Sequence, residues 1–585
     1  MNALAQSIYQ LVEHLTEAYP GFADGYTSFF RCLFPILSFF ILAGAITSLF
    51  HFPKRPEAFA KIRLADGTTF RLKHWECILG HSKSADISLP YETISKLHAV
   101  ISCQEPDNFR ITDLDSKCGT RVGEKEVDGS APLRFGDTFY LGETPLLFLP
   151  ISRDEQKETE KKRRQIRPIP PWSILLLLTF LQLGLCIQFC ITKHEKYAGY
   201  IIPTFLLLSL LMWGYFILMR CFHIIGFELE MIAFYLTTLS LAITTSSIPY
   251  SLPKQLVSIV LGIFVFLALG FLLRDLQRVQ KLRWIMAAFA LGLMLLTLLL
   301  GQLRYGATNW IRLGPLSFQP SELAKLCYIF AGSATLDRLF RRRNLGLFML
   351  LSFSVIVCLG LMSDFGTAAI FFITFLVIAF LRSGDFATLL LVTGGAVTAG
   401  AMVLIAKPYI WTRFATWRHA WEYASSGGYQ QVRTMTGIAS GGLFGVGAGN
   451  GYLQRVSASD TDLVFGMVCE ELGLLTGCMA VLCILVLAAY AILSCSMSRS
   501  SFYTIAACSA TSMLVFQTAL NVFGSVDLLP LTGVTFPFVS NGGSSMILSW
   551  GLLAFLKATD TRPRASFANA LRKPKRSGER RKGKS

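Results

Sequence analysis

The chain lacks the features of a disulfide-stapled or zinc-binding protein. Its 14 cysteines form no C-x-x-C pair and have no zinc spacing with the 8 histidines. Most of them, such as Cys358, Cys469 and Cys483, lie in apolar runs, where cysteine acts as a small hydrophobic residue. Neither a disulfide framework nor a structural zinc site is therefore expected.

Charge is also sparse, because only 16% of the residues are charged and 53% are hydrophobic. The net charge of +17 does not indicate a nucleic acid partner, since the basic residues cluster between apolar runs and in the tail. No A-x-A cleavage site follows the first apolar run, which we interpret as an anchor. Many runs approach the roughly 20 residues that cross a bilayer as a helix. The sequence predicts an integral, polytopic α-helical membrane protein.

About thirteen apolar spans are expected, and the charges between them predict the orientation. Basic loops such as RDLQRVQKLR and DRLFRRRN are typical of the cytoplasmic side, which puts the N-terminus outside and the C-terminus inside. The sequence KHEK at 193–196 is a local exception, because it is an outside loop with two lysines. The spans lie at about 30–50, 173–192, 199–219, 226–247, 255–273, 284–301, 322–338, 345–363, 367–381, 386–406, 463–494, 502–524 and 537–557.

Residues 58–150 interrupt the apolar runs with short stretches of alternating apolar and polar residues. Asp66-Gly67 predicts a hairpin turn, and the whole stretch predicts a β-sandwich inserted on the cytoplasmic side. The predicted plan is an N-terminal segment with the first membrane helix (1–52), the sandwich (53–150), a charged linker (151–172), two additional membrane helices (173–221), the remaining membrane core (222–560) and a basic cytoplasmic tail (561–585).

A carboxylate lies at the predicted outer end of the span that begins at Leu463. A charged side chain at a bilayer is costly and indicates a functional site by default, so Asp462 is the first candidate. Glu470 and Glu471 follow about 12 Å deeper along the same predicted helix. We predict a structural role for these two glutamates, such as pairing with neighbouring helices.

Two further features belong to the long outer loop at 407–462. The segment IASGGLFGVGAGNG contains Gly441 and Gly442, and it is either a flexible loop or backbone that can approach a ligand and present N–H groups to phosphate. Arg433 and Arg455 fit an outward-facing anion site, although long loops also escape the charge rule.

Other outer segments carry polar residues near membrane depth. In FQPSELAKL, Glu322 and Lys325 share a helix face, where they can form an ion pair or line a membrane-edge cavity. Asp364 lies at an outer turn, where it can be a structural neighbour of a helix cap. The proline-containing segment 521–545 predicts broken backbone, which membranes tolerate only where it lines protein or a watery cavity. These features fit a reaction on a lipid-linked anionic substrate, and they also fit a transporter.

Five motifs in one order give the chain a family resemblance over about 222–560. They are GATNWIRLGPLSFQPSELAKL, DFGTA, IASGGLFGVGAGNG, TDLVFGMVCEELGL and LPLTGVTFPFVSNGGSS. They resemble the SEDS proteins, the FtsW/RodA/SpoVE family, which have a core of ten membrane helices. The family's essential aspartate, in a His-Thr-Asp-Phe motif, maps onto Asp462, with Asp460 and Leu463 replacing the histidine and the phenylalanine. Glu322 and Lys325 map onto the family's Gln-Pro-Ser-Glu motif and the lysine after it.

The resemblance implies a peptidoglycan glycosyltransferase that polymerises lipid II outside the cytoplasmic membrane for cell elongation, division or sporulation. It also implies a class B penicillin-binding protein as partner. An α-linked diphosphate donor and a β-1,4 product require inversion, so one displacement with a single base suffices. Asp462 is the predicted base for the acceptor hydroxyl, a role worth about 10²–10⁴ in rate. Arg433, Arg455 and the glycine-rich backbone are predicted to hold the diphosphate. Mg²⁺ or another divalent cation is implied by the family, and no residue set in the sequence identifies a metal site.

The stretch 58–150 resembles a forkhead-associated (FHA) domain through ILGHS, SKLHAVI and DLDSKCGTRV. The matching positions are Ser95, Lys96, His98, Gly119 and Thr120. The resemblance implies a phosphothreonine protein as partner, with Ser95, Lys96 and Thr120 as peptide-binding residues. His81 replaces the usual arginine and Cys118 the usual asparagine, which weakens a phosphate site. His98 is predicted to be structural, and phosphate-independent protein contact is the alternative.

Two other functions remain open for the whole chain. A lipid II flippase or transporter of cell-wall precursors could use the same polar groups without forming a bond. A signalling scaffold could use the membrane part only as an anchor for the sandwich.

Overall fold

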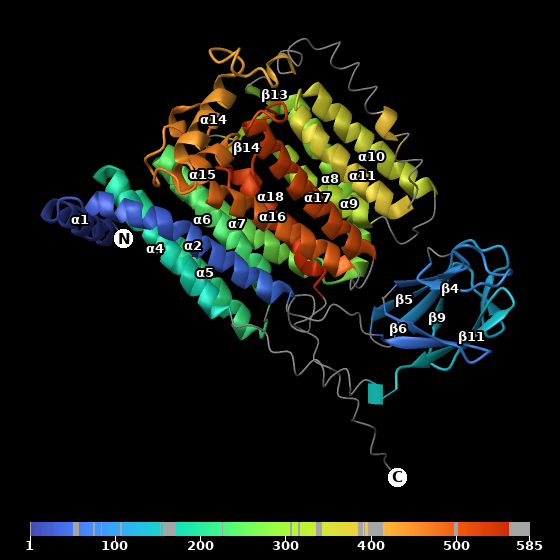
Figure 1. Ribbon diagram of the computed structural model, residues 1–585. Helices are drawn as coiled ribbons and strands as arrows, with labels where there is room; N and C mark the ends of the chain where they lie inside the picture. Colours follow the sequence, from blue (N-terminus) through green and yellow to red (C-terminus); the bar gives the residue numbers. More distant parts are fainter. Residues whose placement is uncertain are drawn as a thin grey trace.

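The structure of the protein is a computed structural model (Figure 1). It describes residues 2–50, 58–73, 76–82, 85–105, 108–152, 154–155, 171–224, 226–304, 307–313, 316–334, 342–383, 390, 392–395, 414–495 and 501–560.

The predicted β-sandwich is confirmed. One sheet has the strand order β2-β1-β11-β10-β7-β8 and the other β4-β3-β5-β6-β9. Side chains such as Ile101 and Phe139 fill the space between the sheets. At the predicted hairpin turn, Gly67 has a φ of +86°, and the Thr68 N–H donates to the Asp66 carboxylate. The strands are β1 Ala60–Leu64, β2 Thr69–Leu72, β3 Glu76–Gly80, β4 Ile87–Ser88, β5 Ala99–Glu105, β6 Asn108–Asp113, β7 Thr120–Val122, β8 Lys125–Glu126, β9 Ser130–Leu133, β10 Thr138–Leu141 and β11 Thr144–Pro150.

Most of the rest of the described chain is helical, and nine of the described helices are long and apolar enough to cross a membrane. The helices before the core are α1 Asn2–Ala18, α2 Phe22–Phe50, α4 Trp172–Thr192 and α5 Ala198–Cys221. The core helices are α6 Glu228–Ser247, α7 Leu252–Leu272, α8 Leu276–Leu300, α9 Pro320–Ala334, α10 Arg342–Leu361, α11 Phe365–Ser383, α14 Tyr429–Gly441, α15 Val464–Leu472, α16 Leu474–Cys495, α17 Ser501–Ser525 and α18 Gly543–Ala558.

The structure differs from the prediction in two of these elements, and a third lies almost wholly outside the described residues. The single span predicted at 463–494 is wrong, because Gly473, with a φ of +92°, separates α15 from α16. The outer loop at 301–322 contains a small antiparallel sheet of β12 Gln302–Arg304, β13 Ala307–Leu313 and β14 Leu316–Phe318, which the sequence analysis missed. The span predicted at 386–406 lies almost wholly outside the described residues.

The β-sandwich and the α14–β13 layer lie at opposite ends of the helical bundle (Figure 1). The sandwich contacts the bundle at the start of α17, where the Ser501 N–H donates to the Glu76 carboxylate at 3.0 Å. At the other end of the same helix, the Asn521 side chain binds the Asp462 carbonyl. The two contacts are separated by 20 residues, or about 30 Å of helix. The sandwich and Asp462 are therefore separated by a membrane-spanning length.

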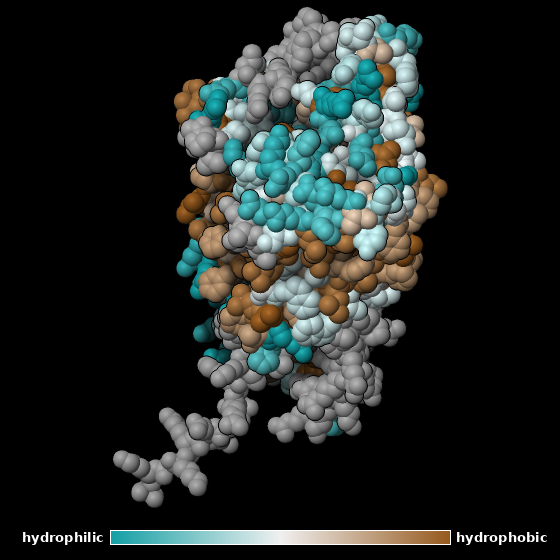
Figure 2. Space-filling view, turned by 90° about the vertical axis from the view of Figure 1, so that its left-hand side faces the viewer, coloured by the Kyte–Doolittle hydropathy of each residue, from teal (hydrophilic) through white to brown (hydrophobic). Residues whose placement is uncertain are grey.

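The helices before the core cover one flank of it. Figure 2 shows an apolar band across this flank, and α4 and α5 contribute exposed Phe180, Leu210 and Ile217. Behind them the most apolar stretch of α6 is entirely buried. Buried polar contacts join the layers, because Gln182 donates to Thr238 at 3.0 Å. Since α6 carries buried polar side chains and is fully covered by its neighbours, the helices that precede the core are packed as an integral part of the fold.

Candidate functional site

Asp462 lies immediately before α15, in a turn where its N–H donates to the Ala458 carbonyl at 2.9 Å. The residue is half-buried. Its carboxylate faces Gly533, where a Cβ atom would lie 3.2 Å from Oδ2, and Gly533 has a φ of +68°. The segment before α18, where the prolines and glycines predicted broken backbone, therefore packs directly against the candidate base.

The side chains of α17 hold this segment in place. Asn521 donates to the carbonyls of Asp462 and Val534 at 2.9 and 2.8 Å. One turn earlier, Gln517 donates to both oxygen atoms of Thr535. The Thr535 hydroxyl in turn pairs with Ser545 on α18 at 2.8 Å. The sequence analysis missed Gln517 and Asn521, although two amides four residues apart in an apolar span were the available signal.

Glu322 and Lys325 form the predicted ion pair at the start of α9, with Lys325 Nζ 2.8 Å from Glu322 Oε1. Glu322 is 4% exposed and Lys325 is 1% exposed. The second carboxylate oxygen, Oε2, has no hydrogen-bond partner among the described residues. A buried ion pair with one oxygen left over is costly in structural terms. Such a group is suited to lining a polar site.

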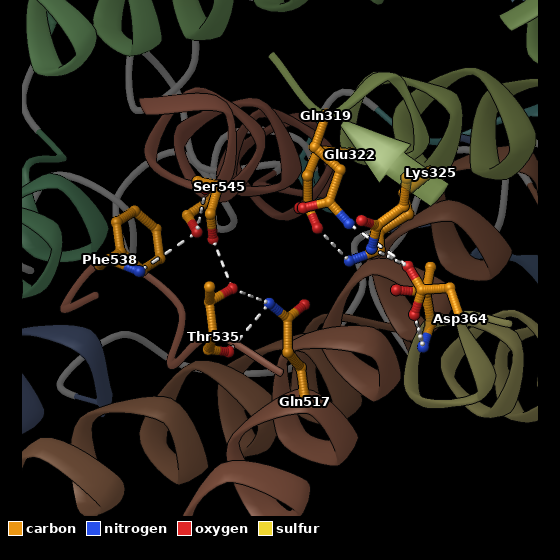
Figure 3. Close-up of polar contacts among 11 residues, drawn as sticks. Gln319, Glu322, Lys325, Asp364, Gln517, Thr535, Phe538 and Ser545 are labelled. Carbon is orange, nitrogen blue, oxygen red and sulfur yellow. Dashed lines mark hydrogen bonds and ion pairs between the residues drawn. The ribbon is translucent and has the colours of Figure 1, made fainter. Parts of the chain in front are cut away.

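Asp364 joins the same region from the turn before α11. It accepts hydrogen bonds from Asn309 at 2.7 Å, from Gln319 at 3.4 Å and from the Thr367 N–H at 3.1 Å. The last contact is the helix-cap role that the sequence predicted. Figure 3 shows this group, with Glu322 and Lys325, facing Gln517, Thr535 and Ser545. The structure thus assembles polar side chains from α9, from the turn before α11, and from α17 and α18 beside the segment that packs against Asp462.

The glycine-rich segment has a different role from the predicted one. The N–H groups of Tyr452 and Leu453 donate to the Glu470 carboxylate, both at 2.9 Å, and the Gly449 N–H donates to Glu471 at 2.8 Å. The N–H groups of Val446 and Gly447 donate to the main-chain carbonyls of the same two glutamates. These donors are therefore not available to a diphosphate. The predicted structural role of Glu470 and Glu471 is confirmed, with a loop as their main partner.

Gly441 and Gly442 differ in the space around them. A Cβ at Gly441 would clash with the main chain of Cys469 and Glu470, so this glycine is needed for packing against α15. This packing accounts for the glycine, and its predicted role in substrate binding stays a prediction. Gly442, with a φ of +56°, ends α14 and has open space around it. A substrate contact at Gly442 stays a prediction.

Arg433 and Arg455 are exposed, the first on α14 and the second on the loop that follows it. Each guanidinium lies over a tyrosine ring, Arg433 over Tyr429 and Arg455 over Tyr452. The Gln430 amide donates to the Ser457 carbonyl at 2.9 Å, which ties α14 to the loop that carries Arg455. Both guanidinium groups are accessible to an anion, as their predicted role requires.

The FHA-like loops are held by buried polar contacts. His98 is fully buried, accepts from the Ser95 N–H at 3.0 Å and bonds the Gly119 carbonyl at 3.0 Å, so its predicted structural role is confirmed. Thr120 is also buried and donates its hydroxyl to Asp113, and its predicted peptide contact stays a prediction. Ser95 accepts from the Lys117 N–H at 2.9 Å, and Lys96 is exposed.

Asp113 organises the second of these loops. It accepts from the N–H of Ser116 at 3.0 Å and from the Ser116 hydroxyl at 2.7 Å, besides Thr120. Burial raises the pKa of the Asp113 carboxyl, but the hydrogen bonds from Thr120 and Ser116 and the nearby His98 lower this pKa overall. The loop that carries Lys117 and Cys118 is therefore built on an ionised carboxylate.

Comparison with known proteins covers both parts of the chain. The family model FTSW_RODA_SPOVE, described as "Cell cycle protein", matches residues 215–564, and the FHA domain model matches residues 77–142. The probable peptidoglycan glycosyltransferase FtsW of Moranella endobia is 28% identical over 348 residues, which cover 57% of this chain and 91% of the relative. The protein of the same name from Dichelobacter nodosus is 34% identical over 301 residues, which cover 48% of this chain and 74% of the relative.

Among solved structures, the crystal structure of the rod shape determining protein RodA from Thermus thermophilus is similar to this chain. It is 26% identical, with a TM-score of 0.42, and the match covers 57% of this chain and 95% of RodA.

Proposed function

The chain belongs to the FtsW/RodA/SpoVE family and carries an FHA domain, and from this premise we propose that it is a peptidoglycan glycosyltransferase. Its substrate is lipid II, which it polymerises into β-1,4 glycan strands on the outer face of the cytoplasmic membrane. The observation that carries the proposal is the position of Asp462, half-buried before α15 and anchored through its carbonyl to Asn521.

The proposed chemistry is a single inverting displacement. Asp462 removes the proton from the 4-hydroxyl of the acceptor sugar as that oxygen attacks the donor sugar. The diphosphate leaves toward Arg433 and Arg455, whose exposed guanidinium groups compensate its charge. Glu322, Lys325 and Asp364 form the polar wall of the site, and Glu470 and Glu471 hold the adjoining loop. One carboxylate acts as base, so a second nucleophilic carboxylate is not required.

We propose a divalent cation only as a companion of the substrate diphosphate. Among the described residues no group of three or more His, Cys, Asp or Glu side chains could hold a metal ion. These residues do not fit a cation held by protein ligands alone. Mg²⁺ commonly binds through one or two carboxylates together with substrate phosphates. A divalent cation would therefore enter with the diphosphate of the substrate, and no catalytic step is assigned to it.

The orientation and partners complete the proposal. The FHA domain and the tail at 561–585 face the cytoplasm, and Asp462 faces outward, which agrees with the basic loops and with the 30 Å or so of helix between Ser501 and Asn521. A class B penicillin-binding protein crosslinks the strands that this protein makes. A cytoplasmic protein contacts the FHA domain, either through phosphothreonine or independently of phosphate.

One assay separates polymerase from transporter. Purified protein in detergent, where no membrane separates two compartments, is incubated with lipid II, and the products are resolved on a gel for glycan strands. A polymerase makes strands in this assay, whereas a flippase or a scaffold leaves lipid II unchanged. Absence of strands with folded protein, in the presence of the penicillin-binding partner and of Mg²⁺, would contradict the proposed function.

A further inference from the structure

Lys193 is one of the two lysines of the KHEK loop that depart from the charge rule, and it has defined contacts in the structure. Lys193 directly follows α4, in the KHEK loop, and is only half-exposed. Its ammonium group donates to the Ser246 carbonyl at 2.8 Å and to the Gln454 side-chain oxygen at 3.0 Å. Lys193 therefore joins a helix that precedes the family core to two separate parts of that core.

The first of these parts is the loop at 445–456, which we call the glutamate-bound loop. Its N–H groups at Gly449, Tyr452 and Leu453 bind Glu471 and Glu470 from one side. Lys193 contacts the same loop through the Gln454 side chain. The Gln454 amide is itself fixed, because its nitrogen donates to the Gly451 carbonyl at 2.8 Å. The lysine therefore meets a preoriented acceptor.

The second part is the end of α6, which leads to the candidate base. The Ser246 hydroxyl donates to Glu471, and the Ser247 hydroxyl donates to the Asp460 carboxylate at 3.1 Å. Asp460 also accepts from the Asn541 N–H through its carbonyl and from the Asn541 amide through its carboxylate, both at 2.8 Å. Asp460 lies two residues before Asp462. Lys193 thus contacts the segment that leads into Asp462 directly at Gln454, and it contacts the end of α6, whose next residue Ser247 binds Asp460.

Close packing supports the same junction. A Cβ atom at Gly449 would clash with the Thr192 hydroxyl, and one at Gly447 would lie 2.7 Å from a methyl carbon of Thr27. These two glycines let α2 and α4 press against the glutamate-bound loop. The glycine-rich sequence is therefore explained at these positions by contact with the helices that precede the core.

We propose that Lys193 is a positioning residue for Asp462, and that α2 and α4 are a working part of the catalytic apparatus. This inference rests on the proposed function. The lysine touches neither sugar nor diphosphate in this scheme. It fixes the glutamate-bound loop against the end of α6, so that the turn at 458–462 holds its carboxylate in place for the acceptor hydroxyl. Small displacements of a catalytic group reduce the rate of the chemical step strongly.

The test compares two lysines of the same loop. Lys193→Met keeps the apolar stem and removes the donors, whereas Lys196→Met is the matched control, because Lys196 is exposed and its ammonium lies over the Tyr197 ring. Lys193→Met is expected to lower kcat for lipid II polymerisation by roughly 10- to 100-fold and to change KM little. Lys193→Arg is expected to recover much of the rate. Lys196→Met should polymerise like the unchanged protein.

A second pair of measurements covers the case in which Lys193→Met folds poorly. Gln454→Leu removes the same contact through its acceptor, and its effect on kcat should not add to that of Lys193→Met. Hydrogen exchange of the N–H groups at 449–453 and 458–462 should be faster in Lys193→Met than in Lys196→Met.

The outcomes are distinct for the two proposals. If the unchanged protein makes no strands, the proposed function fails, and the exchange measurement still decides whether Lys193 orders the loop. Unchanged exchange rates, or an active protein whose Lys193→Met variant keeps its full kcat, would overturn the positioning role while leaving the glycosyltransferase proposal standing.

Discussion

The side-chain amide of Asn521 donates to the main-chain carbonyl of Asp462 at 2.9 Å and to that of Val534 at 2.8 Å. A single buried amide on α17 therefore joins the candidate base to the broken segment that covers it. The candidate base is thus anchored through its backbone carbonyl.

Replacing this amide should disturb the site without touching the carboxylate. Asn521→Leu leaves the buried carbonyl of Val534 without this donor, at a cost of about 1–3 kcal/mol, and it also removes the contact to the part-buried carbonyl of Asp462. We expect a lower thermal unfolding temperature and at least a tenfold loss of lipid II polymerisation. Ser525→Ala is the control, because the Ser525 hydroxyl bonds only within the helix, to the Asn521 carbonyl. Equal activity in both variants would remove the anchoring role of Asn521.

Loss of the base itself should abolish activity while the protein stays folded. Asp462→Asn keeps the size of the side chain and removes its ability to accept a proton. We expect polymerisation to fall by about 10²–10⁴, measured as the initial rate of strand formation at matched amounts of folded protein. The exposed acid Glu422, changed to Gln in the same outer region, should have little effect. Full activity of Asp462→Asn would exclude the residue as base.

The ion pair of α9 should respond differently to single and double changes. Lys325→Met leaves the Glu322 carboxylate buried and unpaired, and such a change costs about 3–5 kcal/mol. Combining it with Glu322→Gln removes the stranded charge, so the double variant should unfold at a higher temperature than Lys325→Met. If both residues line the polar site, the double variant should still polymerise poorly. Wild-type rates in the double variant would reduce the pair to a structural role.

The FHA domain should lose stability in acid through Asp113. Its pKa is lower in the folded domain than in the unfolded chain, so the unfolded chain binds more protons between the two values. The stabilisation is present above the ordinary aspartate pKa and is lost as the pH falls through the folded-state pKa. Hydrogen exchange of residues 113–120 in the intact protein should therefore accelerate on acidification. Asp113→Asn should remove much of this pH dependence, whereas the exposed neighbour change Asp115→Asn should preserve it.

Phosphothreonine binding should be weak because His81 stands where the family has arginine. A histidine cannot make the bidentate contact that a guanidinium makes with phosphate. We expect calorimetry with phosphothreonine peptides to show binding only near millimolar concentration, and His81→Arg to tighten it at least tenfold. Lys96→Met should weaken it, since Lys96 is exposed beside Ser95. No binding to either the unchanged protein or His81→Arg would favour phosphate-independent contact.

The sequence by itself determined the features that depend on composition and periodicity. Apolar runs of membrane length gave most of the helices, alternation gave the sandwich, and Asp66-Gly67 gave its first hairpin. Glu322 and Lys325 were predictable as a pair, since residues three apart on a helix face each other.

Only the tertiary structure decided which partners the remaining polar residues contact. Glycine-rich backbone can approach a ligand or another helix, and the sequence cannot distinguish these two cases. In the fold, N–H groups of this loop donate to Glu470 and Glu471, which lie 20 or so residues away along the chain. In the same way, Lys193 and Gln454 are 261 residues apart in the sequence. Contacts at such separation arise when helices pack side by side, and the local sequence does not encode which neighbour each helix meets.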